Sequence, residues 1–117
     1  MTAGSDEPDV AYLTTSGRIT GAAHRIEIWF AFGAGNAYLL AGGGERSDWV
    51  RNLLVSPDVV LQVGDRKRSA RARVLAAGSE EDADARRLLL DKYTSRGSAN
   101  LSDWGKTALA VAIDWPD

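Results

Sequence analysis

A loop dense in glycine, hydroxyl and arginine side chains is the first candidate for chemistry. It reads TTSGRITG over residues 14–21, between two stretches that alternate like strands. Glycines let backbone N–H groups close around an anion, and the guanidinium of Arg18 donates in a planar fork. The loop therefore suits a phosphate or a carboxylate, although a polar hairpin loop with a solvated arginine explains the same residues.

A second candidate is the glycine run at 42–44, directly before a predicted helix that carries Trp49 and Asn52. Glycines before a helix start can cradle an anion or let a flat ring approach the backbone. The alternative is a plain linker between strand and helix, with Trp49 packed in the core.

Three further side chains have a chemical and a structural interpretation. His24, the single histidine, could act as an acid or base near neutral pH, hydrogen-bond a ligand, or simply begin a strand. Arg25 follows it on the opposite face and could form only a surface ion pair. Tyr93 could supply a phenolic proton, although core packing is the commoner use of such a ring. The arginines between residues 66 and 73 indicate a solvated strand edge.

The elements that must position these residues alternate between hairpins and short helices. Strands are predicted over 10–15, 24–32, 37–41, 59–63, 69–74 and 108–113, with turns at 33–36 and 64–65. One helix begins near 47 or 48 and stops at Ser56-Pro57, and another spans about 80–93 behind the capping residue Ser79. This order predicts a mainly β (α+β) fold, a small antiparallel barrel of about six strands with two short helices.

Composition narrows the function. The 117 residues fit one domain over 10–117 behind a flexible lead-in at 1–9, and the net charge of −2 argues against nucleic acid. With no cysteine and one histidine, no metal site is expected, so we expect any chemistry to be carried by a bound organic cofactor. The N-terminus has no signal-peptide order and no apolar run reaches the ~18 residues of a membrane span, so a cytoplasmic protein is expected.

Four segments taken together resemble a known family. LTTSGRITG, HRIEIWF, YLLAGGG and DWVRNLLVSPDV, in this order, are similar to the deazaflavin-dependent nitroreductase group of the split β-barrel flavin/deazaflavin oxidoreductases. The resemblance covers about residues 12–75 and continues weakly at Lys92-Tyr93 and in DWGKTAL near the end.

The resemblance implies a homodimeric split β-barrel that uses deazaflavin (coenzyme F420) to pass a hydride to a quinone, a nitro compound or another electron-poor small molecule. An FMN-binding reductase of the same fold, and a non-catalytic module for a cofactor, lipid or tetrapyrrole, are the alternatives. Tyr93 is the implied proton donor. The implied cofactor-binding residues are Thr15, Ser16, Arg18, Thr20, Gly21, His24, Arg25, Ala41, Gly42, Gly43, Trp49 and Asn52.

The chain departs from the family pattern at two basic positions. Ile19 stands where relatives often carry a lysine after the loop arginine, and Ala23-His24-Arg25 replaces a proline-arginine step. Fewer cationic contacts imply weaker or altered binding of the acidic cofactor tail.

Overall fold

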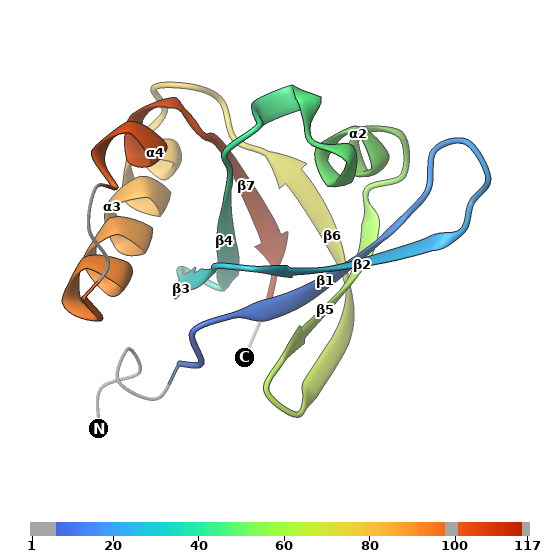
Figure 1. The fold of residues 1–117 in the computed structure, drawn as a ribbon, viewed down its shortest axis with the longest axis horizontal. Coiled ribbons are helices and arrows are strands. Elements are labelled where there is room, and N and C mark those ends of the chain that lie inside the picture. The colour runs from blue at the N-terminus through green and yellow to red at the C-terminus, as the bar shows by residue number, and fades with distance from the viewer. Residues whose placement is uncertain (1–6, 98–100, 116–117) are drawn as a thin grey trace.

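The fold is a curled antiparallel sheet with helices at its sides, seen in a computed structural model that describes residues 7–97 and 101–115 (Figure 1). Seven strands follow the order β2-β1-β5-β6-β7-β4-β3. The strands are β1 Ala11–Ser16, β2 Ala23–Ile28, β3 Ala31–Gly33, β4 Asn36–Ala41, β5 Asp58–Val63, β6 Arg66–Val74 and β7 Leu109–Asp114. The helices are η1 Gly44–Arg46, α2 Asp48–Val55, α3 Glu80–Ser95 and α4 Ser102–Thr107. The predicted mainly β architecture is confirmed, with one strand more than expected.

The extra strand arises because the predicted strand at 24–32 is broken at Trp29-Phe30. Its first part, β2, pairs with β1, and its second part, β3, pairs with β4. Between them the backbone N–H of Phe30 donates to the Tyr93 hydroxyl at 2.8 Å, and the Phe30 carbonyl accepts from Lys92 Nζ at 2.7 Å. Side chains of α3 thus take the place of a strand partner, and the chain turns from one half of the sheet to the other.

A two-residue turn, Ala34-Gly35, joins β3 to β4, as the glycine-rich sequence predicts. Gly33 pairs with Asn36 across it. Ala34 and Gly35 have φ values of 50° and 77°, the left-handed conformation that a type I′ hairpin turn requires at both positions.

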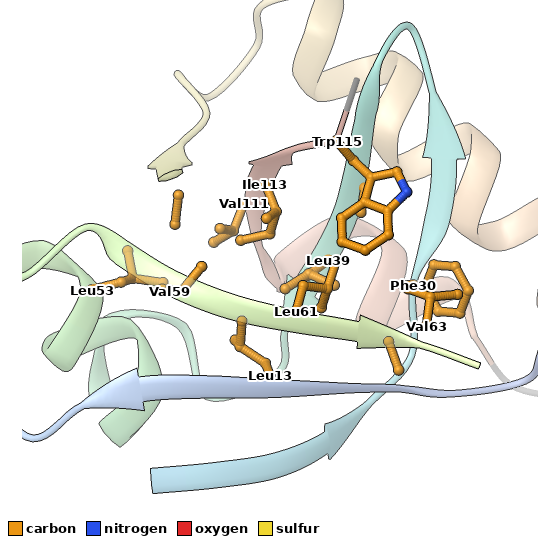
Figure 2. Close-up of a cluster of buried hydrophobic side chains, with 13 residues drawn as sticks. Leu13, Phe30, Leu39, Leu53, Val59, Leu61, Val63, Val111, Ile113 and Trp115 are labelled. Atoms are coloured by element: carbon orange, nitrogen blue, oxygen red, sulfur yellow. The ribbon is translucent and has the colours of Figure 1, made fainter. Parts of the chain in front are cut away.

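Strand β6 connects the two halves of the sheet. Its residues 66–71 pair with β5, and residues 72–74 pair with β7. The predicted solvated edge is wrong in its placement, because β6 lies between β5 and β7 in the sheet order, although the side chains of Arg66, Lys67 and Arg71 are exposed. Between the halves lies a cluster of thirteen buried apolar residues, among them Leu13, Leu39, Leu61 and Ile113, each 0% exposed (Figure 2). A second cluster lies beneath α3.

The helices match the predicted ones in part. In α2, Val50 and Leu53 are buried as expected, but Leu54 is 57% exposed and the polar Asn52 is turned inward. Helix α3 begins at its predicted cap, where Ser79 Oγ accepts from the Asp82 N–H, and ends two residues beyond the predicted limit. Helix α4 was not predicted. No helix of the described residues is long and apolar enough to span a bilayer.

The chain preceding β1 is attached to α3, in contrast to the predicted lead-in at 1–9, of which residues 1–6 lie outside the described part. Glu7 Oε1 lies 3.0 Å from Lys92 Nζ, and Asp9 Oδ1 lies 2.6 Å from Arg96 Nη1. The Lys92 ammonium is buried, which lowers its pKa, while the bond to Glu7 opposes that shift. Residues 7–9 therefore belong to the folded domain.

Candidate functional site

A groove of about 500 Å³ opens between the β1–β2 loop, the start of β2 and the first turns of α2. It brings together the loop and the helix that the sequence singled out separately. Seven of the predicted site residues line it: Thr15, Arg18, Thr20, His24, Arg25, Trp49 and Asn52. We call this the Arg18 groove.

The loop at 17–22 is closed by its own backbone. Strands β1 and β2 stay paired as far as Ser16 and Ala23. The Gly17 N–H then donates to the Ala22 carbonyl at 2.7 Å, and the Gly21 N–H donates to the Gly17 carbonyl at 2.8 Å. A Cβ at Gly17 would lie 2.7 Å from Nε2 of His24, so glycine at this position lets the imidazole pack against the loop.

Asn52 fixes the position of Arg18. Its Oδ1 accepts from the Arg18 backbone N–H at 3.2 Å and from Arg18 Nη1 at 2.9 Å. Its Nδ2 donates to Thr15 Oγ1 at 3.1 Å. Asn52 is 3% exposed and Thr15 is 1% exposed, so this network links the loop to both β1 and α2 beneath the groove.

The groove has a cationic and an apolar part. Its basic side chains are Arg18, His24 and Arg25, and Ile26 and Trp49 supply apolar surface. Arg18 Nη2 lies 3.4 Å from the Asp48 carboxylate, whose side chain is 85% exposed and therefore well screened by water.

Arg25 is positioned by its neighbours on the outer face of the sheet. Its guanidinium stacks on the Tyr12 ring, 4.2 Å from the centroid, and Nη2 donates to Gln62 at 3.3 Å. A guanidinium has five N–H donors, so both arginines keep donors for a ligand.

The comparison with protein families gives one match over almost the whole chain. The model of the F420H(2)-dependent quinone reductases matches residues 3–115. The chain belongs to this family. It is accordingly an oxidoreductase of the F420-dependent reductases. No sequence among the curated proteins matches the chain.

Solved structures place this quinone reductase family member in the split β-barrel fold. The F420-H2 dependent reductase FDR-A is 20% identical, with a TM-score of 0.72 over 90% of this chain and 93% of that one. A second F420 reductase is 18% identical, with a TM-score of 0.62 over 93% and 87%. The heme storage protein HutZ from Vibrio cholerae is 12% identical, with a TM-score of 0.76 over 97% and 85%. At such identities the likeness concerns the fold alone.

The donors of the Arg18 groove fit the cofactor of the F420H(2)-dependent quinone reductases. An acidic tail requires cationic and hydroxyl donors, which Arg18, Arg25, His24 and Thr20 offer along one side. A flat ring requires apolar contact, which Trp49 offers on the other. Ile19, which stands where the resemblance implies a lysine, adds no charge to the groove, and its side chain is 87% exposed in the loop.

Five predicted site residues do not line the groove. Ser16 and Gly21 belong to the same loop region but are not among the lining residues. Ala41 is buried in β4, 2% exposed. Gly42 and Gly43 lie beyond it, where an added Cβ would meet Trp104 at 3.8 Å and Ser47 Oγ at 2.7 Å. Gly42 and Gly43 thus lie against Trp104 and Ser47, neither of which lines the groove.

Tyr93 is remote from the groove, so the geometry gives no support to its prediction as a proton donor. It is 2% exposed and stacks on Trp29 with ring centroids 4.1 Å apart. Its hydroxyl accepts from the Phe30 N–H and donates to the Asp9 carbonyl at 2.7 Å. Burial raises its pKa to about 12. These contacts make Tyr93 a structural residue that holds the break between β2 and β3.

Five lining residues of the groove were not predicted as site residues: Gly17, Ile19, Ala23, Ile26 and Asp48. Ile26 shares a face of β2 with His24, and this alternation was a sufficient signal for it. Gly17 and Asp48 gave no such signal. The place of Gly17 depends on how His24 packs against the loop, and that of Asp48 on an ion pair with Arg18, thirty positions earlier.

Proposed function

We propose that the protein transfers a hydride from reduced F420, bound in the Arg18 groove, to a quinone, a nitro compound or another electron-poor small molecule. The family match supports the cofactor and the reaction class. The observation that carries the site is the convergence of Arg18, His24 and Arg25 with Trp49 on one groove, from segments up to 31 residues apart (18 to 49).

The proposed roles follow from the chemistry of the lining. Arg18, Arg25 and the Thr20 hydroxyl bind the acidic tail, and His24 hydrogen-bonds it at the start of β2. Trp49 and Ile26 contact the ring and exclude water from one side of it. When bound, the reduced deazaflavin supplies the hydride, and the protein supplies orientation and charge compensation. Asn52 holds Arg18 in place from beneath.

The proposal includes a cytoplasmic homodimer. One similar structure, 19% identical with a TM-score of 0.72 over 92% of this chain and 81% of that one, is described as a domain-swapped dimer. In the described sheet β2 is an edge strand, paired only with β1. An edge of this kind is open to a second copy.

A titration with two cofactors tests the proposal. We expect oxidised F420 to bind with higher affinity than FMN. In a separate activity assay, we expect the protein to reduce menadione with F420H2 as the hydride donor. Arg18→Ala should weaken F420 binding by about 1.5 to 3 kcal/mol, the scale of a charge-assisted hydrogen bond, or roughly 10- to 150-fold in Kd. Arg51→Ala is the matched control, since Arg51 lies exposed on α2, donates to the Glu45 carbonyl and does not line the groove.

The outcomes separate the alternatives. Preferential binding of FMN would assign the protein to the flavin users of this fold. Tight F420 binding without reduction of any quinone or nitro acceptor would indicate a binding module. If Arg18→Ala and Arg51→Ala both fold and bind F420 with equal Kd values, F420 does not bind in the Arg18 groove.

A further inference from the structure

A second groove adjoins the Arg18 groove along strand β2. It has a volume of about 380 Å³ and opens between the end of β2, strand β4 and helix α4. Ile26 lines the Arg18 groove and Ile28 lines the second one. Both side chains lie on the same face of β2, since they are two residues apart, and their Cα atoms are about 7 Å from each other. The two grooves therefore meet on neighbouring side chains. We call the second one the Trp104 groove.

Aromatic and aliphatic side chains form most of the Trp104 groove. Leu40 and Leu101 line it together with Trp29 and Trp104. Tyr93 covers one face of Trp29, and Trp104 stands perpendicular to both rings, with its centroid 5.5 Å from that of Trp29 and 6.4 Å from that of Tyr93. These similar distances place Trp104 beside the stacked pair, so neither ring covers the second face of Trp29. Because Trp29 and Trp104 are both partly exposed, apolar ring surface remains for a planar molecule.

The two grooves differ in charge. The Arg18 groove contains Arg18, His24 and Arg25. Among the described residues that line the Trp104 groove, Glu27 is the one charged side chain. Its Oε1 accepts from the Tyr12 hydroxyl at 3.3 Å, and it forms no ion pair with the described residues. A polyanionic molecule is therefore attracted to the first groove, whereas the second favours a molecule without negative charge.

We propose that the Trp104 groove binds the electron acceptor, and that it selects planar acceptors without negative charge. This inference rests on the proposed function, because it requires the hydride donor in the neighbouring Arg18 groove. The selectivity arises from the apolar rings, which contact the acceptor, and from Glu27, which repels an anion.

The position of the Trp104 groove suits the transfer step. Hydride transfer requires the reacting atoms to lie about 3–3.5 Å apart, and two molecules in grooves that meet on Ile26 and Ile28 can approach this closely. A quinone in the Trp104 groove receives the hydride, with its two electrons, and becomes the hydroquinone monoanion. It then takes a proton from solvent, while reduced F420 is oxidised and releases one.

Amide NMR of the full chain with menadione as the probe tests the groove without F420. The indole N–H signals of Trp29 and Trp104 report on the Trp104 groove, and that of Trp115, which lines neither groove, is the control. Their assignment follows from the three Trp→Phe variants. Menadione forms no thiol adduct here because the chain has no cysteine. We expect menadione to shift the Trp29 and Trp104 signals in a saturable way and to leave the Trp115 signal in place.

A charged analogue and two variants test the selectivity. At pH 7, 2-hydroxy-1,4-naphthoquinone is an anion, and it differs from menadione in one substituent. We expect it to bind about 5-fold more weakly, because Glu27 repels it. Glu27→Gln, at an exposed position, should improve its binding by about 3-fold or more and leave the menadione Kd within about 2-fold. The matched control is Glu45→Gln, at an exposed carboxylate of η1 outside the groove, which should change neither Kd.

The outcomes distinguish this proposal from the proposed function. Unmoved Trp29 and Trp104 signals, equal affinity for the two quinones, or an affinity for the anion that Glu27→Gln leaves unchanged would overturn the proposal. Displacement of menadione by F420 would also overturn it, because donor and acceptor must bind together. Failure of F420 to bind, with the menadione shifts retained, would refute the proposed function and leave the quinone site in place.

Discussion

Replacing Asn52 by alanine probes the connection between the β1–β2 loop and helix α2. The side chain makes three hydrogen bonds, two to Arg18 and one to Thr15. The two bonds to neutral donors or acceptors contribute about 0.5–1.5 kcal/mol each. A hydrogen bond to a charged guanidinium contributes more, but the Arg18 side chain is 28% exposed, so water compensates for part of that free energy when the bond is lost. We therefore expect Asn52→Ala to lower the free energy of unfolding by about 2–4 kcal/mol.

Urea denaturation followed by tryptophan fluorescence measures this loss, and a thermal melt gives a second reading. Since about 1 kcal/mol moves the Tm of a domain near this size by roughly 3–6 °C, the melt should shift by more than about 6 °C. The affinity for F420 should fall as well, because Arg18 loses its support. The matched control is Asn36→Ala, at a nearly buried asparagine outside the Arg18 groove, which should cost stability but leave F420 affinity unchanged. If Asn52→Ala unfolds within about 0.5 kcal/mol of the unmodified protein, the network does not position Arg18 and the reasoning is wrong.

Two other predictions concern Tyr93 and the glycines. Because burial raises the pKa of Tyr93 to about 12 from 10.0, the unfolded chain loses this proton first, and stability declines as the pH rises from 10 to 12. Two pKa units correspond to about 2.7 kcal/mol, so the stability difference between the unmodified protein and Tyr93→Phe should narrow over this range in urea titrations at pH 9, 10 and 11; a constant difference would contradict the raised pKa. Gly17→Ala should destabilise by about 1–3 kcal/mol because the new Cβ meets His24, whereas Gly42→Ala, with its nearest neighbour at 3.8 Å, should stay within about 0.5 kcal/mol. Equal melting temperatures of these two variants would refute the proposed packing of His24.

The sequence was sufficient for the strands whose alternation is undisturbed. In β5, Val59, Leu61 and Val63 are buried as their spacing predicts. It was insufficient at Trp29-Phe30, because the alternation of Ile26, Ile28, Phe30 and Phe32 continues through the break. The break depends on α3 side chains more than sixty residues away, and no local pattern carries that information.

The same distinction holds for the candidate site. Arg18, Trp49 and Asn52 were chosen for their residue types, and the fold brings them to one groove. Asn52 was predicted as a direct cofactor contact, and it lines the groove; its hydrogen bonds to Arg18 add a supporting role that the sequence did not indicate. The glycine run was expected beside the ring because glycines before a helix often face ligands. The contact of Gly42 with Trp104 depends on the position of α4, whose six residues have no clear apolar period, while Gly43 packs against Ser47 four residues later.

The sharing of β6 between the two halves of the sheet has a consequence for how the molecule comes apart. Residues 66–71 of β6 pair with β5 and residues 72–74 pair with β7, so both halves lose hydrogen bonds once β6 detaches. The halves are consequently cooperative, and heating should melt both in one transition. In hydrogen exchange, the amides near the crossing at Ala72, which is 4% exposed, should open only with the whole domain.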